Sequence, residues 1–185
     1  MKTRNNHNIW APWRNQYIRS IDPDPAGSDL DRCFFCEYWA NPDNDRKNRV
    51  LWRTSSCLVV FNKYPYTAGH LLISPEKHLP DMDPLNDQTL LELMRLTRDS
   101  QKILRHSISP HGFNVGINLN RSAGAGLPGH FHIHVVPRWQ GDTNFMSVTG
   151  DVRVISQSLD DLYDQLKENS EKLNLPAESL QTTDS

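Results

Sequence analysis

Short apolar runs alternate with polar, turn-forming stretches along most of the chain. Three runs, at 50–54, 58–62 and 71–74, are largely apolar and lie between turn-forming residues, which predicts β-strands. Apolar residues alternate with Gly or Asn between 113 and 119, and with His between 131 and 135. Alternation with a period of two predicts two further strands, of which the first should be half-buried.

Two segments show the helical period instead. Asn86 or Asp87 can cap a helix that runs to about His106. The residues on its apolar face are Leu90, Met94, Thr97, Ile103 and Leu104. Ser158 and Asp161 resemble a capping box at the start of a second helix. Its apolar face is Leu159, Leu162, Tyr163 and Leu166. This order predicts an α+β fold: an antiparallel sheet of about five strands, a long helix and a C-terminal helix.

Composition narrows the class of protein. The 185 residues suffice for one domain with a core, and a net charge of −2 gives no footprint for nucleic acid. No stretch approaches a membrane span, and residues 1–7 lack the apolar region of a signal peptide. We therefore expect a cytoplasmic protein in a reducing compartment, with no membrane partner. Residues 20–32 and 40–48 are rich in Asp, Pro, Asn and Gly, which predicts loops.

The candidate chemistry centres on a histidine row, His130, His132 and His134. In an extended strand these imidazoles face one side while the apolar residues between them face the other. Neutral imidazole is a nucleophile, a metal ligand and a proton shuttle near neutral pH. The alternative is a half-exposed strand with chance histidines. With 8 His in 185 residues, a perfect period of two inside an apolar run makes chance a poor explanation.

The cysteines leave two possibilities open. In a reducing compartment Cys33, Cys36 and Cys57 are thiols or metal ligands rather than a disulfide framework. The Cys33-x-x-Cys36 spacing is half of a zinc site, but a redox pair has the same spacing. Cys57 begins an apolar run, which is typical of a buried small hydrophobe.

The histidine row, with apolar residues between and after its members, resembles the signature of the histidine-triad (HIT) nucleotide-binding family. The likeness extends over about residues 9–167 and is greatest to the bacterial diadenosine-tetraphosphate phosphorylase-like branch. The segments that carry it besides the row are 10–17, 62–75, 112–119 and 136–146. The resemblance implies the HIT fold, which agrees with the α+β prediction.

The resemblance also implies roles in cleaving a phosphoric anhydride. The middle histidine, His132, would be the nucleophile that forms a nucleotidyl-histidine, and His134 would contact the phosphate. His70, in a Gly-His pair, would complete the site, although a turn histidine bonded to backbone would look the same. The nucleotide-binding candidates are Asn62 for the ribose, Asn118, and the small residues Gly124, Ala125 and Gly126, whose N–H groups can cradle phosphate.

Two further implications concern the metal and the acceptor. A zinc-bearing subset of the family places its remaining ligands where this chain has His78 and His130, which would complete a structural zinc site with Cys33 and Cys36. Many members carry Gln four positions before the first histidine of the row, where Gly126 stands here. That departure resembles the phosphorylase-like branch and leaves room for orthophosphate as the acceptor.

The function that we expect is cleavage of dinucleoside polyphosphates, above all diadenosine tetraphosphate, with phosphate as a co-substrate and no organic cofactor. The alternatives are a nucleoside phosphoramidase, a HIT hydrolase that releases a nucleoside monophosphate, and a nucleotide-binding regulatory protein. The domain plan that we expect is an N-terminal arm at 1–30, a HIT domain at 31–173 and a disordered tail at 174–185. The family commonly dimerises, which implies a homodimer or a higher homo-oligomer.

Overall fold

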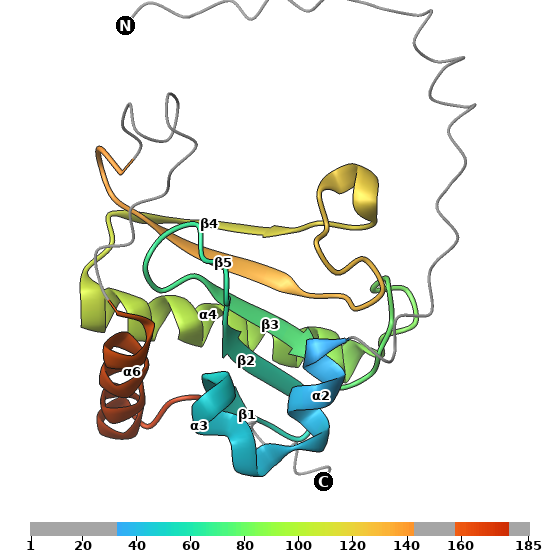
Figure 1. Cartoon of the computed structure of the whole chain (residues 1–185), viewed down its shortest axis with the longest axis horizontal. Helices are drawn as coiled ribbons and strands as arrows, with labels where there is room; N and C mark the ends of the chain where they lie inside the picture. The colour runs from blue at the N-terminus through green and yellow to red at the C-terminus, as the bar shows by residue number, and fades with distance from the viewer. Residues whose placement is uncertain (1–32, 143–157, 178–185) are drawn as a thin grey trace, which may run out of the picture.

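The computed structural model describes residues 33–142 and 158–177 of the chain. Its centre is a five-stranded antiparallel sheet in the order β1-β2-β3-β5-β4 (Figure 1). The strands are β1 (Val50–Arg53), β2 (Cys57–Phe61), β3 (Leu71–Pro75), β4 (Gly112–Ile117) and β5 (Ile133–Arg138). The α+β prediction with about five strands is confirmed.

Helices cover the two faces of the sheet unequally. The long helix α4 (Asp87–Ile108) and the C-terminal helix α6 (Leu159–Leu173) bury the larger apolar cluster, which includes Phe131, Ile133 and Val135. The short helix α2 (Phe34–Ala40) lies over the other face and packs into a smaller cluster with Leu58, Val60 and Leu72 (Figure 1). The residues between the histidines therefore face α4, and the histidine row faces α2.

The register of the sheet places the end of the histidine row. His134 pairs with Leu72 of β3 on one side and with Gly116 of β4 on the other. Strand β5 begins only at Ile133, so His130 and His132 lie in the segment that leads into it. The predicted alternation nevertheless holds, because Phe131 belongs to the core under α4 while the rings of His130 and His132 lie 5.0 and 5.4 Å from the Phe35 ring of α2.

Helix α4 begins where the capping pattern predicted, with the Asn86 side chain accepting a hydrogen bond from the Thr89 N–H. One member of its predicted apolar face is wrong, because Met94 is 59% exposed. Leu93 takes the inward position instead, together with Leu96. The apolar stripe is thus rotated slightly from the one that the sequence suggested.

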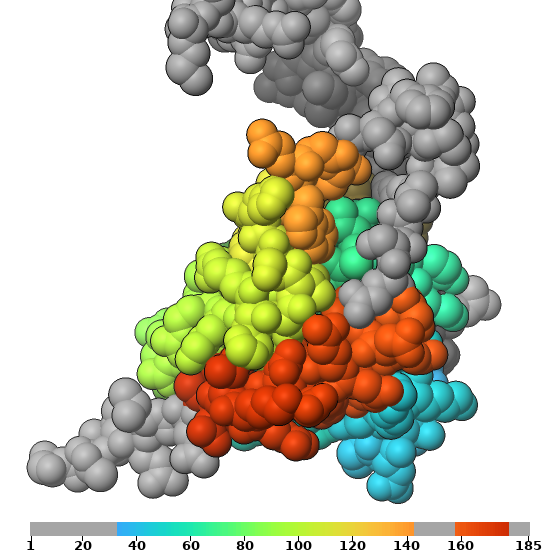
Figure 2. Space-filling model, turned by 90° about the vertical axis from the view of Figure 1, so that its left-hand side faces the viewer, coloured from blue at the N-terminus to red at the C-terminus, as the bar shows by residue number. Residues whose placement is uncertain are grey.

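The predicted loop at 40–48 is wrong, since this stretch forms η2 (Pro42–Asn44) and α3 (Asp45–Asn48). Proline at the start of η2 suits the first position of a helix. Arg46 then donates to Asp164 of α6 at 2.8 Å, a contact that spans 118 residues of sequence. Figure 2 shows the side chains of α6 lying between those of α4 and those of the α2–α3 segment.

The C-terminal helix anchors the sheet edge. Ser158 caps α6 by accepting from the Asp160 N–H, and the Trp52 indole donates to Ser170 at 3.0 Å. Beyond residue 173 the chain stays packed, because Leu175 is buried and the Ala177 N–H donates to Asp99. The predicted N-terminal arm at 1–30, the loop at 20–32 and residues 178–185 of the predicted tail lie outside the described residues.

Strand β4 forms one edge of the sheet. It is more open than the half-buried strand that we predicted, because Val115 and Ile117 are 44% and 37% exposed. Helix α4 covers β3 and β5 rather than this edge.

Homo-oligomer formation stays a prediction. No helix in the described ranges is long and apolar enough to cross a membrane.

Candidate active site

The histidine row lies beneath α2, next to His70 and to the residues Cys33, Cys36 and His78. His130, His132 and His70 are almost fully buried, at 1%, 5% and 1% exposure. His70 comes from the start of β3, next to the strand that carries His134. A buried imidazole without a partner is costly, so the hydrogen bonds of each ring nitrogen decide what the ring can do.

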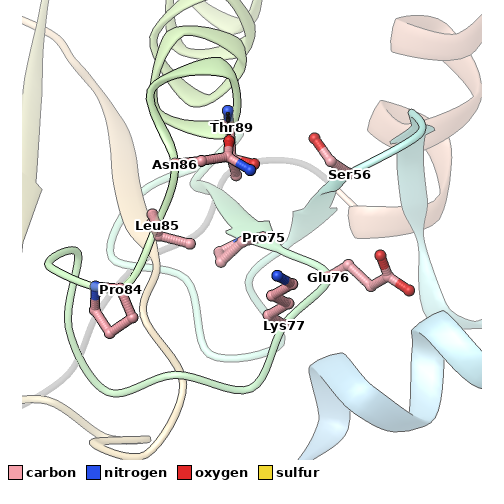
Figure 3. A pocket seen from close by; sticks show the side chains of 8 residues that line it. All are labelled: Ser56, Pro75, Glu76, Lys77, Pro84, Leu85, Asn86 and Thr89. Atoms are coloured by element: carbon pink, nitrogen blue, oxygen red, sulfur yellow. Dashed lines mark hydrogen bonds between the residues drawn. The ribbon is translucent and has the colours of Figure 1, made fainter.

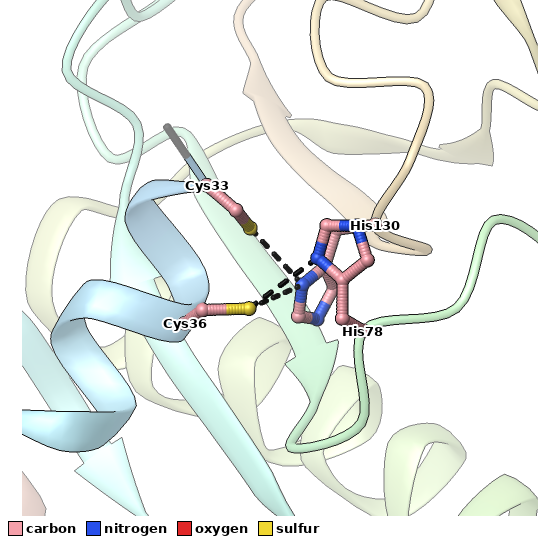
Figure 4. A group of neighbouring side chains, drawn as sticks. All are labelled: Cys33, Cys36, His78 and His130. Atoms are coloured by element: carbon pink, nitrogen blue, oxygen red, sulfur yellow. Dashed lines mark hydrogen bonds between the residues drawn. The ribbon is translucent and has the colours of Figure 1, made fainter. Parts of the chain in front are cut away.

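His130 belongs to a metal-type cluster with Cys33, Cys36 and His78 (Figure 4). The candidate ligand atoms of the four residues all lie within 4.8 Å of one another. The Nε2–H of His130 donates to the Pro75 carbonyl at 2.9 Å, which leaves the lone pair on Nδ1 facing the Cys33 Sγ at 3.2 Å. His78 presents its Nδ1 to the Cys36 Sγ at 3.3 Å. A carbonyl partner of this kind orients imidazoles that bind metals.

The donor set fits zinc in chemistry as well as in position. Two thiols and two imidazoles are the ligands of many tetrahedral structural zinc sites. Burial lowers the pKa of His130 to about 4, which keeps the imidazole neutral and able to bind a metal. Burial and the neighbouring Cys33 raise the pKa of Cys36 to about 11, so the thiolate needs a nearby cation. These residues could therefore hold a zinc ion between the start of α2 and the histidine row.

His132 is oriented differently from His130. Its Nδ1–H donates to the backbone carbonyl of His130 at 2.7 Å, which places the lone pair on Nε2. Burial lowers the pKa of its imidazole and favours the neutral ring. The Phe35 ring, between the two cysteines in sequence, lies 5.4 Å from the His132 ring and holds it from the α2 side. A neutral ring with one fixed lone pair is the form that acts as a nucleophile.

His70 is placed by the glycine before it. Gly69 has φ +77°, and a Cβ there would lie 2.8 Å from Leu104 of α4, so only glycine suits this turn. The Nδ1 of His70 lies 3.2 Å from both the Tyr66 N–H and the Asn62 amide nitrogen. Its Nε2 lies 3.0 Å from the Nδ1 of His134. His70 therefore contacts the row itself as well as the backbone of a turn.

His134 differs from His130 and His132 in the hydrogen bonding of its ring. Burial lowers the pKa of its imidazole to about 4. Its Nε2 is buried and has no hydrogen-bond partner among the described residues. The Tyr66 ring stacks over it at 6.2 Å. An unsatisfied buried ring nitrogen beside a candidate nucleophile marks a place where a ligand atom can bind.

The small-residue loop before the row holds part of its backbone to itself. The N–H of Gly124 donates to the Arg121 carbonyl at 2.8 Å, and the N–H of Ala125 donates to the Asn120 carbonyl at 3.3 Å. In this conformation those two groups are not open to a phosphate. Gly126 is exposed, and no atom lies within 4 Å of a Cβ built on it. At Gly126 the loop therefore provides open space rather than a preformed anion-binding nest.

The predicted asparagines lie at the two edges of the site. Asn118 directly follows β4, and alternation from Gly116, the partner of His134, puts it on the histidine face. Asn62 follows β2 and contacts His70. This contact and those of Phe35 and Tyr66 were not predicted from the sequence. The signals were available, since Phe35 lies between two candidate ligands and Tyr66 lies four residues before His70.

A separate pocket opens at the start of α4 (Figure 3). It is lined by Ser56, Pro75, Glu76, Lys77, Pro84, Leu85, Asn86 and Thr89. None of the predicted site residues lines it. Its link to the site is indirect, because Pro75 turns its carbonyl to His130.

The sequence is similar to that of known proteins. Residues 44–141 match the family model described as HIT domain. A Mycobacterium tuberculosis protein named AP-4-A phosphorylase is 38% identical over 156 residues, which cover 83% of this chain and 78% of that protein. A Schizosaccharomyces pombe protein named bis(5'-nucleosyl)-tetraphosphatase (asymmetrical) is 30% identical over 95 residues, which cover 51% of this chain and 52% of that protein.

Solved structures show the same fold. A zinc-bound histidine triad family protein from Mycobacterium smegmatis superposes with a TM-score of 0.63 at 23% identity, over 77% of this chain and 96% of that one. A histidine triad nucleotide-binding protein from Sulfolobus tokodaii gives a TM-score of 0.61 at 23% identity, over 77% and 94%. With a domain match over more than half of its length and a 38% identical relative that aligns with most of it, this chain belongs to the HIT family.

Proposed function

We propose that this protein is an enzyme that cleaves dinucleoside polyphosphates, diadenosine tetraphosphate in particular, through a nucleotidyl group on His132. The observation that carries the proposal is the His132 ring, buried, neutral and held with its lone pair on Nε2. The relative named AP-4-A phosphorylase and the relative named tetraphosphatase both support a substrate of this class.

The first step is an in-line displacement at the α-phosphorus. The Nε2 lone pair of His132 forms the N–P bond, the bond from phosphorus to the bridging oxygen breaks, and ATP leaves with that electron pair. The ring gains positive charge in the adduct, and the His130 carbonyl at 2.7 Å from Nδ1 stabilises that charge. No proton has to leave His132, because Nε2 carries none.

The second step returns His132 to its starting state. An acceptor oxygen attacks the phosphorus, the N–P bond breaks, and the electron pair returns to Nε2. Orthophosphate as the acceptor gives ADP, and water gives AMP. The open space at Gly126, four residues before the row, supports orthophosphate, because no atom lies within 4 Å of a Cβ built there. The relative named tetraphosphatase favours water as the second candidate.

The metal-type cluster has a supporting part in this proposal. Cys33, Cys36, His78 and His130 would hold one zinc ion, whose contribution is to fix the start of α2 against the row. Because the carbonyl of His130 orients His132, fixing His130 also fixes the nucleophile. The zinc-bound relative in the same fold is consistent with this role.

The test uses diadenosine tetraphosphate with orthophosphate labelled with oxygen-18. We expect ATP and labelled ADP, and slow formation of ATP and AMP when phosphate is omitted. Gly126→Gln should raise the AMP fraction, because the amide fills the open space and can orient water. Gly112→Gln is a matched control at an equally open but remote glycine, and it should leave the product ratio unchanged.

Other outcomes separate the alternatives. If label never enters ADP and AMP forms equally fast with and without phosphate, the protein is a hydrolase and only the role of His132 survives. If adenosine phosphoramidate is cleaved and the tetraphosphate is not, the protein is a phosphoramidase. If nucleotide binds and no product forms from either, the regulatory alternative holds.

A further inference from the structure

Hydrogen-bond directions around His70 locate its proton. The Oδ1 of Asn62 accepts from the Tyr64 N–H at 2.9 Å, which turns the Nδ2 amide group of Asn62 toward His70. That amide nitrogen and the Tyr66 N–H both lie 3.2 Å from the Nδ1 of His70. Both groups are donors, so the Nδ1 of His70 is an acceptor and the proton of the neutral ring is on Nε2.

The same reasoning locates the proton of the His134 ring. The Nε2–H of His70 lies 3.0 Å from the Nδ1 of His134, so His70 donates and the Nδ1 of His134 accepts. A neutral His134 then carries its own proton on Nε2. That atom is buried and has no partner in the described parts of the chain. An unpaired buried N–H is unfavourable until an acceptor reaches it.

We propose that Asn62 is a positioning residue whose amide reinforces the Tyr66 N–H, so that both donate to the Nδ1 of His70 and favour the tautomers in which His134 presents an N–H donor. The acceptor is a phosphoryl oxygen of the substrate, so this inference rests on the proposed function. We call Asn62, His70 and His134 the relay. Phosphoryl oxygens only accept hydrogen bonds at neutral pH, so the opposite tautomer would direct a lone pair at an oxygen and repel it.

The relay gives neighbouring rings opposite states at the same atom. The ring of His134 lies 4.9 Å from that of His132. Nε2 of His132 has a lone pair because its Nδ1–H is bound to a carbonyl. Nε2 of His134 has the ring's own proton because its Nδ1 accepts a hydrogen bond from His70. One nitrogen can attack phosphorus while the other donates to the phosphoryl oxygen on which charge develops.

Two substitutions of Asn62 separate the relay from the ribose-binding role that the resemblance implies. Aspartate can accept from ribose hydroxyls but cannot donate to His70. Alanine loses the ribose contact, yet the Tyr66 N–H still holds the Nδ1 of His70 as an acceptor. The relay therefore predicts that Asn62→Asp is the damaging change, and ribose binding predicts that Asn62→Ala is.

The direct measurement is nitrogen-15 NMR of the imidazoles in the zinc-loaded, substrate-free protein. We expect His70 and His134 with protons on Nε2 in the unsubstituted protein and in Asn62→Ala. In Asn62→Asp the carboxylate draws a proton to the Nδ1 of His70. The Nε2 of His70 then becomes the acceptor, so His134 donates from its Nδ1 and loses the proton on Nε2. Asn86→Asp, which adds the same charge at a helix cap, should change neither ring.

Kinetics gives the second readout. Asn62→Asp should lower kcat by roughly 10–100-fold, as loss of an outer hydrogen-bond partner does, and should change KM much less. A proton on the Nδ1 of His134 in the unsubstituted protein would overturn the proposal. So would an unchanged His134 tautomer in Asn62→Asp, or a loss confined to Asn62→Ala. The NMR result requires no substrate, so a correct relay in a protein that leaves the tetraphosphate uncleaved would refute only the proposed function.

Discussion

His130 and His134 stand four residues apart on one face of the same segment, yet they belong to regions with different chemistry. At the metal-type cluster, the Pro75 carbonyl accepts a hydrogen bond from the Nε2–H of His130 and leaves its Nδ1 facing two thiols. At the relay, His70 donates a hydrogen bond to the Nδ1 of His134. The partner of the second nitrogen therefore leaves a different atom of each imidazole available for binding, Nδ1 in His130 and Nε2 in His134.

His132 lies between the two regions and depends on the first of them. Its Nδ1–H is held by the backbone carbonyl of His130, so its orientation follows from the ring that faces the thiols. The metal-type cluster thus acts on the proposed nucleophile through the backbone, and the relay acts through a neighbouring ring. Substitutions in the two regions should therefore have separable effects.

The largest expected effect comes from removing the nucleophile itself. His132→Gln should lower turnover of diadenosine tetraphosphate by about 10⁴-fold or more, because the covalent route is lost. It should leave the metal content unchanged, since His132 is not among the four candidate ligands. Chromatography of the products and elemental analysis measure the two quantities.

His106→Gln, an exposed histidine on α4, is the control and should be as active as the unsubstituted protein. Turnover of His132→Gln within tenfold of that level would remove His132 from the mechanism.

A smaller effect on turnover and a larger one on stability should follow from opening the metal-type cluster. We expect about one zinc ion per chain and its loss in Cys33→Ser. A metal bound about 100 to 1,000 times above its Kd contributes about 3–4 kcal/mol, so Tm should fall by about 5–15 °C. Calorimetry and elemental analysis test this expectation.

The control is Cys57→Ala, which also removes a buried thiol but lies outside the cluster. It should keep the zinc. Freshly prepared protein without zinc, with the Cys33 and Cys36 thiols reactive together, would favour the redox-pair alternative.

The fold could largely be predicted from the sequence because its strands are short apolar runs between turn residues, a local signal. Where the prediction was wrong, the cause is distant. Residues 45–48 form a helix beside α6, and Arg46 reaches Asp164 across 118 residues of sequence. Likewise Met94 is exposed because α4 turns Leu93 and Leu96 inward at this point.

The site was predictable as a set of residue types and much less so as a set of hydrogen bonds. The period of two identified the histidine row, and the cysteine spacing identified half of a metal site. The direction of each proton depends on the Pro75 carbonyl, which lies 55 residues from His130 in sequence, and on the Asn62 amide, which the Tyr64 N–H orients. The assignments of Gly124 and Ala125 to a phosphate cradle stay predictions. In this conformation their N–H groups are hydrogen-bonded within the loop, which a pattern of small residues does not indicate.

The smallest expected effect concerns the imidazole of His134, which burial keeps neutral. Burial lowers the pKa of His134 to about 4, below the ordinary 6.5. Above pH 6.5 the ring is neutral in the folded and the unfolded chain, and the full stability is present. Between pH 6.5 and 4 only the unfolded chain takes up the proton, so the free energy of unfolding falls with pH. Partial exposure of the ring limits this contribution to about 1–2 kcal/mol.

Urea unfolding at pH 7.0 and 4.5 measures that contribution when the unsubstituted protein is compared with His134→Gln. Both should be treated with a chelator, because acid also removes a metal from the thiols of the metal-type cluster and would add its own pH dependence. His130 and His132 remain in both proteins, so the difference between the two pH dependences belongs to His134. The variant should lose less stability on acidification. An equal or greater loss would mean that burial does not hold His134 neutral in the folded protein.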